Sequence, residues 1–73
     1  MKPGDIVQLD PEETENEAFR GCLMTVTEVK TWGVQGYVYP APAGSVTVDG
    51  LAFYRATNGR FQPTGGTTVW QRA

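Results

Sequence analysis

The sequence contains no histidine and a single cysteine, Cys22, among its 73 residues. A lone cysteine cannot form an intramolecular disulfide, and a zinc site without histidine lacks one of its commonest ligands. A nucleophilic Cys22 would also lack the neighbouring base that generates a thiolate. Because Gly21 and Leu23 flank it, we expect Cys22 to be a small buried apolar residue. We therefore expect neither a metal site nor a bound cofactor.

Long apolar segments are also missing from the sequence. No run approaches the roughly 20 apolar residues that a helix needs to cross a bilayer, so we expect no membrane insertion. The reduced thiol and the lack of a recognisable secretion signal favour a cytoplasmic location. A chain of 73 residues corresponds to one domain, residues 1–73, which buries only about 60% of its unfolded surface on folding.

Sequence motifs for catalysis are missing as well. Neither a pair of carboxylates nor a nucleophile motif stands out. The glycines Gly33, Gly36, Gly65 and Gly66 do not have the spacing of a dinucleotide-binding or phosphate-binding loop, so we interpret them as turns and bulges. We therefore expect that the protein is not an enzyme.

The charges are unevenly distributed along the chain. Five of the eight acidic residues lie between Asp10 and Glu17, which leaves six basic residues against three acidic ones elsewhere. We interpret this segment as a solvated acidic loop that keeps a small domain soluble. The alternative interpretation is that this acidic segment recognises a partner or mimics a nucleic acid. The spacing does not match a calcium-binding loop.

Strand signals recur about every ten residues, which is typical of a small barrel or sandwich. Residues 5–9 alternate, with Val7 and Leu9 on one face, and Pro11 ends this strand. We expect a long loop to follow, anchored by Phe19, with room for one helical turn that begins at Thr14 or Asn16 and ends at Gly21.

The next two expected strands form a hairpin. Residues 22–29 are rich in β-branched side chains, and we expect Cys22, Met24 and Val26 to face the core. A turn over 30–33 leads to a return strand over 34–39, in which the mid-strand Gly36 indicates a bend or the close approach of another backbone.

Three further turn signals divide the rest of the chain. The Asp49–Gly50 pair suits the two positive φ angles of a type I′ turn and would join a short strand over 46–48 to a strand over 51–56. The Asn58–Gly59 pair and residues 63–66 indicate two more turns, and residues 67–71 would form the closing strand.

These elements predict an all-β fold, a small SH3-like barrel of five to six short antiparallel strands with a long acidic loop after the first strand. A strand, a long loop, a three-stranded meander and a short closing strand are the plan of SH3-like barrels. The predicted core consists of Val7, Leu9, Phe19, Cys22, Met24, Val26, Val38 and Val69.

A further set of residues is spread over most of the chain: Phe19, Gly21, Cys22, Val26–Glu28, Trp32, Gly33, Gln35–Val38, Phe53, Tyr54 and Arg55, with a Val–Trp pair near the end. In these residues and their order the chain resembles a small family of uncharacterised proteins from tailed bacteriophages and prophages. The resemblance is poor over the connection from Pro40 to Gly50. It implies expression in the bacterial host cytoplasm during phage growth and carries no activity over to this chain.

Eight aromatic residues exceed what so small a core needs, because each buries about 150–250 Å². If Ala52, Tyr54 and Ala56 face inward, Phe53 lies outside beside Arg55. We predict a protein-binding patch built from Trp32, Tyr37, Tyr39, Phe53 and Arg55. The expected partner is a phage or bacterial host protein, and the expected state is a monomer or weak homo-oligomer.

A surface that binds single-stranded nucleic acid is the alternative function. Tyr37, Tyr39 and Phe53 could stack on bases, and the available cations are Lys30, Arg55, Arg60 and Arg72. The isoelectric point near 4.8 argues against it, because neutralisation of phosphates dominates such affinity. Whether the aromatic residues belong to the surface or to the core is left open by the sequence.

Overall fold

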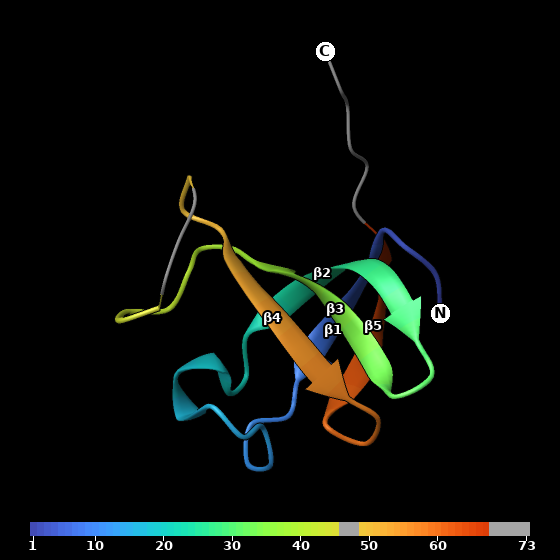
Figure 1. The fold of residues 1–73 in the computed structure, drawn as a ribbon, viewed down its shortest axis with the longest axis horizontal. Coiled ribbons are helices and arrows are strands. Elements are labelled where there is room, and N and C mark those ends of the chain that lie inside the picture. The colour runs from blue at the N-terminus through green and yellow to red at the C-terminus, as the bar shows by residue number, and fades with distance from the viewer. Residues whose placement is uncertain (46–48, 68–73) are drawn as a thin grey trace.

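The computed structural model describes residues 1–45 and 49–67. In this part of the chain, five strands form one antiparallel sheet and a short 3-10 helix, η1 (Glu17–Phe19), follows the first strand (Figure 1). The strands are β1 (Asp5–Leu9), β2 (Leu23–Lys30), β3 (Gly33–Val38), β4 (Ala52–Thr57) and β5 (Phe61–Thr67). Their order is β4-β3-β2-β1-β5, so β1 lies between β2 and β5.

The connection between β4 and β5 shows that this sheet is strongly curled (Figure 1). The two strands lie at opposite edges of the sheet, yet only residues 58–60 join them. In a flat sheet the edges would lie about 19 Å apart, whereas the chain from Thr57 to Phe61 spans at most about 14 Å. The predicted all-β fold is therefore confirmed, with five antiparallel strands in one curled, barrel-like sheet.

The core lies on the concave face and follows the period-two alternation of the strands. Its buried apolar residues are Val7, Leu9, Phe19, Met24, Val26, Val34, Val38, Ala52 and Ala56. Six of the predicted core residues are confirmed by this set. The prediction that Cys22 is a buried core residue is wrong. Cys22 precedes β2 at the end of the loop and is only half-buried at the margin of the core. Val69 lies outside the described residues.

Gly36 allows β2 and β3 to approach closely where the sheet bends. A Cβ atom placed on Gly36 would lie 1.9 Å from the carbonyl oxygen of Thr25. On the opposing strand, Val26 pairs with Gly36 and Glu28 with Gln35, so Thr27 is the extra residue of a β-bulge. The prediction of a bend at this mid-strand glycine is confirmed.

Backbone hydrogen bonds hold the acidic loop in a defined conformation. The carboxylate of Asp10 accepts hydrogen bonds from the backbone N–H groups of Glu12 and Glu13, at 2.7 and 2.8 Å. The buried Thr14 hydroxyl donates to the carbonyl of Asp10, and Nε of Arg20 donates to the carbonyl of Thr14 at 2.8 Å. The acidic segment is thus a folded loop rather than a loose one.

The helical turn in this loop forms as predicted. The Asn16 side chain accepts a hydrogen bond from the N–H of Ala18 and so caps η1. Gly21 follows with a φ angle of 76°, which suits glycine after a helix end. Phe19 is the only apolar side chain of the turn to be buried, and it fastens the loop to the core.

The closing strand differs from the prediction. Residues 63–66 belong to β5 rather than to a turn, and β5 pairs with β1 at the sheet edge, where Pro63 is tolerated. Between the pairs Val7–Pro63 and Asp5–Thr67 the register shifts, so Gly65 and Gly66 fall within an irregularity of the strand. The part of the expected strand that follows residue 67 lies outside the described residues.

The Asp49–Gly50 turn has the backbone angles that its sequence predicts. Asp49 and Gly50 have φ angles of 53° and 78°, both positive as in a type I′ turn. The short strand expected over 46–48 lies outside the described residues. The Asn58–Gly59 turn is confirmed between β4 and β5.

Candidate functional site

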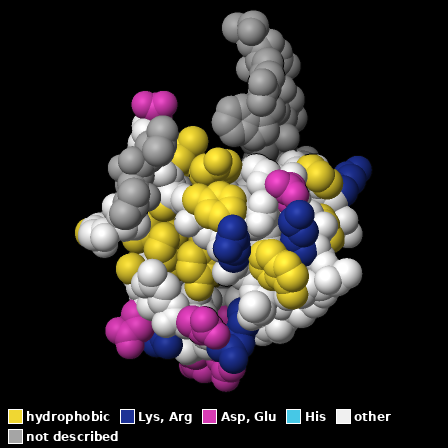
Figure 2. All heavy atoms as spheres, in the orientation of Figure 1, with side chains coloured by type: hydrophobic (Ala, Val, Ile, Leu, Met, Phe, Trp, Pro, Cys, Tyr) yellow, Lys and Arg dark blue, Asp and Glu magenta, His cyan; other side chains and the backbone are white. Residues whose placement is uncertain are grey.

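The convex face of β3 and β4 carries aromatic side chains that the core does not use. Because Val34, Val38, Ala52 and Ala56 face inward, the alternation directs the intervening residues outward. Tyr37 pairs directly with Phe53, and their side chains are 39% and 43% exposed. Figure 2 shows hydrophobic side chains gathered on this face beside basic ones.

Tyr37, Phe53 and Arg55 touch one another and form what we call the aromatic–arginine cluster. The rings of Tyr37 and Phe53 meet edge to face, with centroids 5.6 Å apart and an interplanar angle of 69°. The guanidinium carbon of Arg55 lies 5.6 Å from the centroid of Phe53, within cation–π distance. The structure therefore brings together three of the five predicted binding residues.

Tyr39 lies beyond the end of β3 and is outside this contact network. Its side chain is 69% exposed. A Cβ atom placed on Gly50 would lie 3.3 Å from Cε2 of Tyr39, so the ring packs over the Asp49–Gly50 turn. Tyr39 therefore extends the apolar surface without a ring contact to the cluster.

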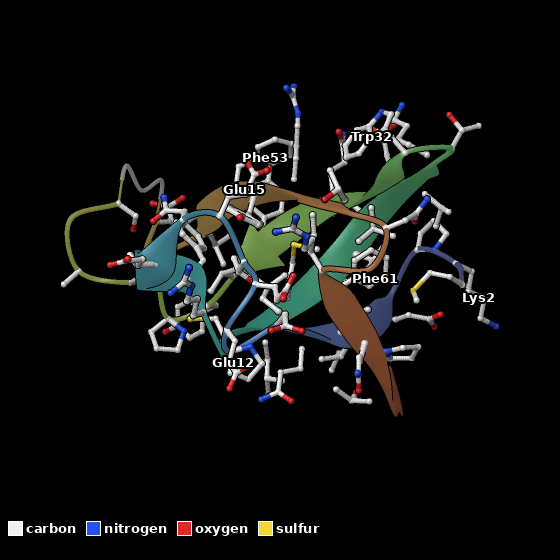
Figure 3. All side chains as sticks on the ribbon, turned by 90° about the horizontal axis from the view of Figure 1, so that it is seen from below. Lys2, Glu12, Glu15, Trp32, Phe53 and Phe61 are labelled. Carbon is white, nitrogen blue, oxygen red and sulfur yellow. The ribbon has the colours of Figure 1, made fainter. Side chains whose placement is uncertain are left out.

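Trp32 lies in the turn between β2 and β3 and is 40% exposed. Asn58 fixes this turn against the end of β4. Its backbone N–H donates to the carbonyl oxygen of Trp32 and its side-chain amide donates to the carbonyl oxygen of Thr31, and both hydrogen bonds are 2.9 Å long. Trp32 and Phe53 lie on the same side of the sheet (Figure 3). Trp32 therefore flanks the cluster without a ring contact to it.

The cations around this face are not equally available. Nζ of Lys30 pairs with Glu28 at 2.8 Å, and Gln35 donates to the same carboxylate at 3.0 Å. The hydrogen bond from Lys30 lowers the pKa of Glu28 below its usual value. Among the residues that the structure describes, Arg55 has no carboxylate within ion-pair distance. Its charge is therefore available to a partner.

The other cations considered for nucleic-acid binding are directed elsewhere. Nη1 of Arg60 donates to the carbonyl of Glu13 and so helps to hold the acidic loop. Arg72 lies outside the described residues. Lys30 and Arg60 are therefore both engaged by other groups of the protein.

The sequence did not reveal that the acidic loop borders the cluster. Glu15 and Asn16 face Phe53, Tyr54 and Arg55 across a shallow depression of about 500 Å³. Figure 3 shows Glu15 near Phe53. The only sequence signal for this contact was Phe19, which anchors the loop but does not indicate the strand against which it packs.

The described residues contain no group of three acidic or cysteine side chains that could hold a metal ion. No helix in the described ranges is long and apolar enough to cross a membrane. The chain matches no protein-family model, no curated protein and no solved structure. The resemblance to phage proteins therefore stays a prediction.

Proposed function

We propose that this chain is a non-enzymatic protein-interaction module of a phage or prophage, and that it binds its partner through the aromatic–arginine cluster with Trp32 and Tyr39 beside it. The observation that carries this proposal is the outward position of Tyr37 and Phe53 on a barrel whose core is filled by other residues. Exposed apolar patches rimmed by polar groups mark interaction surfaces.

The composition of this surface favours a protein partner. Aromatic residues and arginine are enriched at the centres of protein interfaces, where they supply large contact areas. Arg55 presents a guanidinium that no described carboxylate neutralises, and the ring of Phe53 holds it in place. A partner segment with an apolar side chain next to a carboxylate would complement both groups.

A nucleic-acid partner is less well supported. Two of the candidate cations, Lys30 and Arg60, are occupied by Glu28 and by the acidic loop. Of the candidate cations that the structure describes, this leaves Arg55, which lies beside a segment rich in carboxylates. Because phosphate neutralisation supplies most nucleic-acid affinity, one such arginine is a poor basis for binding nucleic acid.

The proposal is tested by capture from phage-infected bacteria with the purified chain as bait, together with a titration of single-stranded DNA at low and high salt. We expect a phage or host protein to be retained specifically and no salt-sensitive DNA binding. DNA binding that weakens steeply with salt, without a specific protein, would favour the nucleic-acid alternative instead.

The bait experiment has a matched control in Val29, which is 44% exposed. Val29 pairs with Val34, whose side chain is buried, so Val29 lies on the face opposite to the cluster. Val29→Ser therefore removes an exposed apolar side chain without altering the proposed surface, whereas Phe53→Ser removes the ring at its centre.

A further inference from the structure

We propose that the partner binds the free edge of β4 as an added antiparallel strand, with its main chain paired to Phe53 and Arg55. This inference rests on the proposed function, because it specifies how a protein partner reaches the aromatic–arginine cluster. The occupant is an extended segment with an acidic residue opposite Arg55 and an apolar residue opposite Phe53. Addition of a strand to an exposed sheet edge is a recurring mode of peptide recognition.

Alternate residues of β4 direct their backbone N–H and C=O groups toward β3 or away from it. The N–H of Asn58, directly after β4, donates over 2.9 Å to a carbonyl oxygen of the turn that precedes β3. A Cβ atom placed on Gly33 would lie 2.0 Å from the carbonyl oxygen of Ala56, which therefore points toward β3. The N–H and C=O groups of Phe53 and Arg55 consequently point out of the sheet edge.

These outward groups have no backbone partner among the described residues. β4 lies at the end of the strand order, next to β3. The hydrogen bonds outside the strands include none from the described residues to the backbone of Phe53 or Arg55. Further along, the carbonyl of Thr57 already accepts the N–H of Arg60. The available part of the edge is therefore centred on two residues of the cluster.

The two edges of the sheet differ in how well they could accept a strand. β5 contains Pro63, which has no N–H, and its pairing with β1 shifts in register. Such features protect an edge against added strands. β4 contains neither proline nor glycine and pairs with β3 over six consecutive residues without a shift. The regular edge is thus the one that carries the exposed aromatic side chains.

The surroundings of this edge select the chemistry of the added strand. The edge opens onto the shallow depression beside Glu15 and Asn16, which no described residue of β3 lines. Directly opposite residues of an antiparallel pair share a face of the sheet. A carboxylate opposite Arg55 would meet a guanidinium that no described acidic side chain pairs with. An apolar side chain two positions away would cover the exposed ring of Phe53.

The probe is a synthetic peptide, acetyl-Thr-Thr-Glu-Thr-Val-Thr-amide, added at millimolar concentration to the isotope-labelled full chain. We expect saturable binding that slows hydrogen exchange at the N–H groups of Phe53 and Arg55. Phe61 in β5 is the control. The preceding carbonyl, that of Arg60, accepts the N–H of Asp10, so the N–H of Phe61 points out of the opposite edge. Its exchange rate should not change.

Peptides methylated at single backbone nitrogens test the pairing itself. Methylation of the glutamate or the valine removes an N–H that would donate to Arg55 or Phe53, and should weaken binding about tenfold. Methylation of the threonine between them removes an N–H that points away from β4, and should leave the affinity nearly unchanged. Replacing the glutamate by glutamine should weaken binding several-fold to the wild type but not to Arg55→Gln.

The inference is overturned if the peptide does not bind, or if methylation at all three positions has the same effect. Slow exchange of Phe53 and Arg55 in the free protein would also overturn it. If that protection disappears on dilution, a second copy occupies the edge, and if it persists, the chain itself covers the edge. These measurements need no captured partner. If a captured protein depends on Phe53 but the peptide protects neither amide, the proposed function stands and the added strand does not.

Discussion

The ring of Phe19 stacks on the ring of Tyr54, with centroids 4.5 Å apart and an interplanar angle of 21°. Phe19 ends the helical turn of the acidic loop, and Tyr54 is the partly buried residue between Phe53 and Arg55 on β4. This contact joins two segments that are distant in sequence. It holds Glu15 and Asn16 beside the aromatic–arginine cluster.

Phe19→Ala should unfold the domain. Removing a buried phenylalanine costs about 3–5 kcal/mol, which equals the whole stability expected of a core this small. Tyr54→Phe keeps the stacked ring and should change stability little. Urea denaturation followed by circular dichroism measures both variants. A cooperative transition of Phe19→Ala near the wild-type midpoint would show that the loop is not anchored by this ring.

Gly36→Ala should also prevent folding, for a steric reason. The added methyl group would lie 1.9 Å from the Thr25 carbonyl oxygen, so β2 and β3 would have to separate. Gly44→Ala is the control, because its methyl group meets no atom within 4 Å, although the φ angle of +83° there costs about 1–2 kcal/mol. Equal losses of stability in the two variants would contradict the close approach at Gly36.

Acid should destabilise the fold through Asp10. Hydrogen bonds from the N–H groups of Glu12 and Glu13 lower its pKa below the ordinary value of 3.8. A carboxyl with a lowered folded-state pKa stabilises the protein above its unfolded pKa and loses this contribution as the pH falls through the folded pKa. We therefore expect the free energy of unfolding to decrease below about pH 4.

Asp10→Asn isolates this contribution, because the amide oxygen can still accept both hydrogen bonds but does not titrate. Its free energy of unfolding should fall less steeply with acid than that of the wild type. The remaining slope includes Glu28, whose pKa is also lowered. If the free energies of unfolding of wild type and Asp10→Asn depended on pH in the same way, Asp10 would not contribute to the acid sensitivity of the fold.

Cys22 should react more slowly with a thiol reagent in the native protein than in urea. Its side chain is half-buried against the core, and Sγ lies 3.8 Å from the carbonyl oxygen of Ala18. We expect a several-fold difference in rate rather than complete protection. Equal rates in the two states would show that the loop opens freely around this residue.

The parts of the fold that the sequence predicts well are those with a local cause. Alternation of apolar residues gives β1 and the inward face of β3, and the Asp49–Gly50 pair specifies its own turn angles. The outward position of Phe53 beside Arg55 follows from the small residues Ala52 and Ala56, which face the core.

The parts that the sequence did not predict depend on contacts between distant segments. Pro63, Gly65 and Gly66 indicate a turn locally, but pairing with β1 makes them part of an edge strand. Thr27 is the extra residue of a bulge, and residues 27–30 are all exposed, which alternation alone does not reveal. Likewise, only the stacking of Phe19 on Tyr54 determines that the acidic loop borders the cluster.

The most direct test of the central claim compares the affinity of the captured partner for wild type, Phe53→Ser, Tyr39→Ser and Val29→Ser, with the stability of each variant measured in urea. We expect Phe53→Ser and Tyr39→Ser to weaken binding by about 2 kcal/mol each, roughly 30-fold, as for interface anchors. Val29→Ser should bind as the wild type does, and all variants should remain folded. Unchanged affinity of Phe53→Ser, or unfolding of the domain by this substitution, would contradict the claim that the cluster is a binding surface.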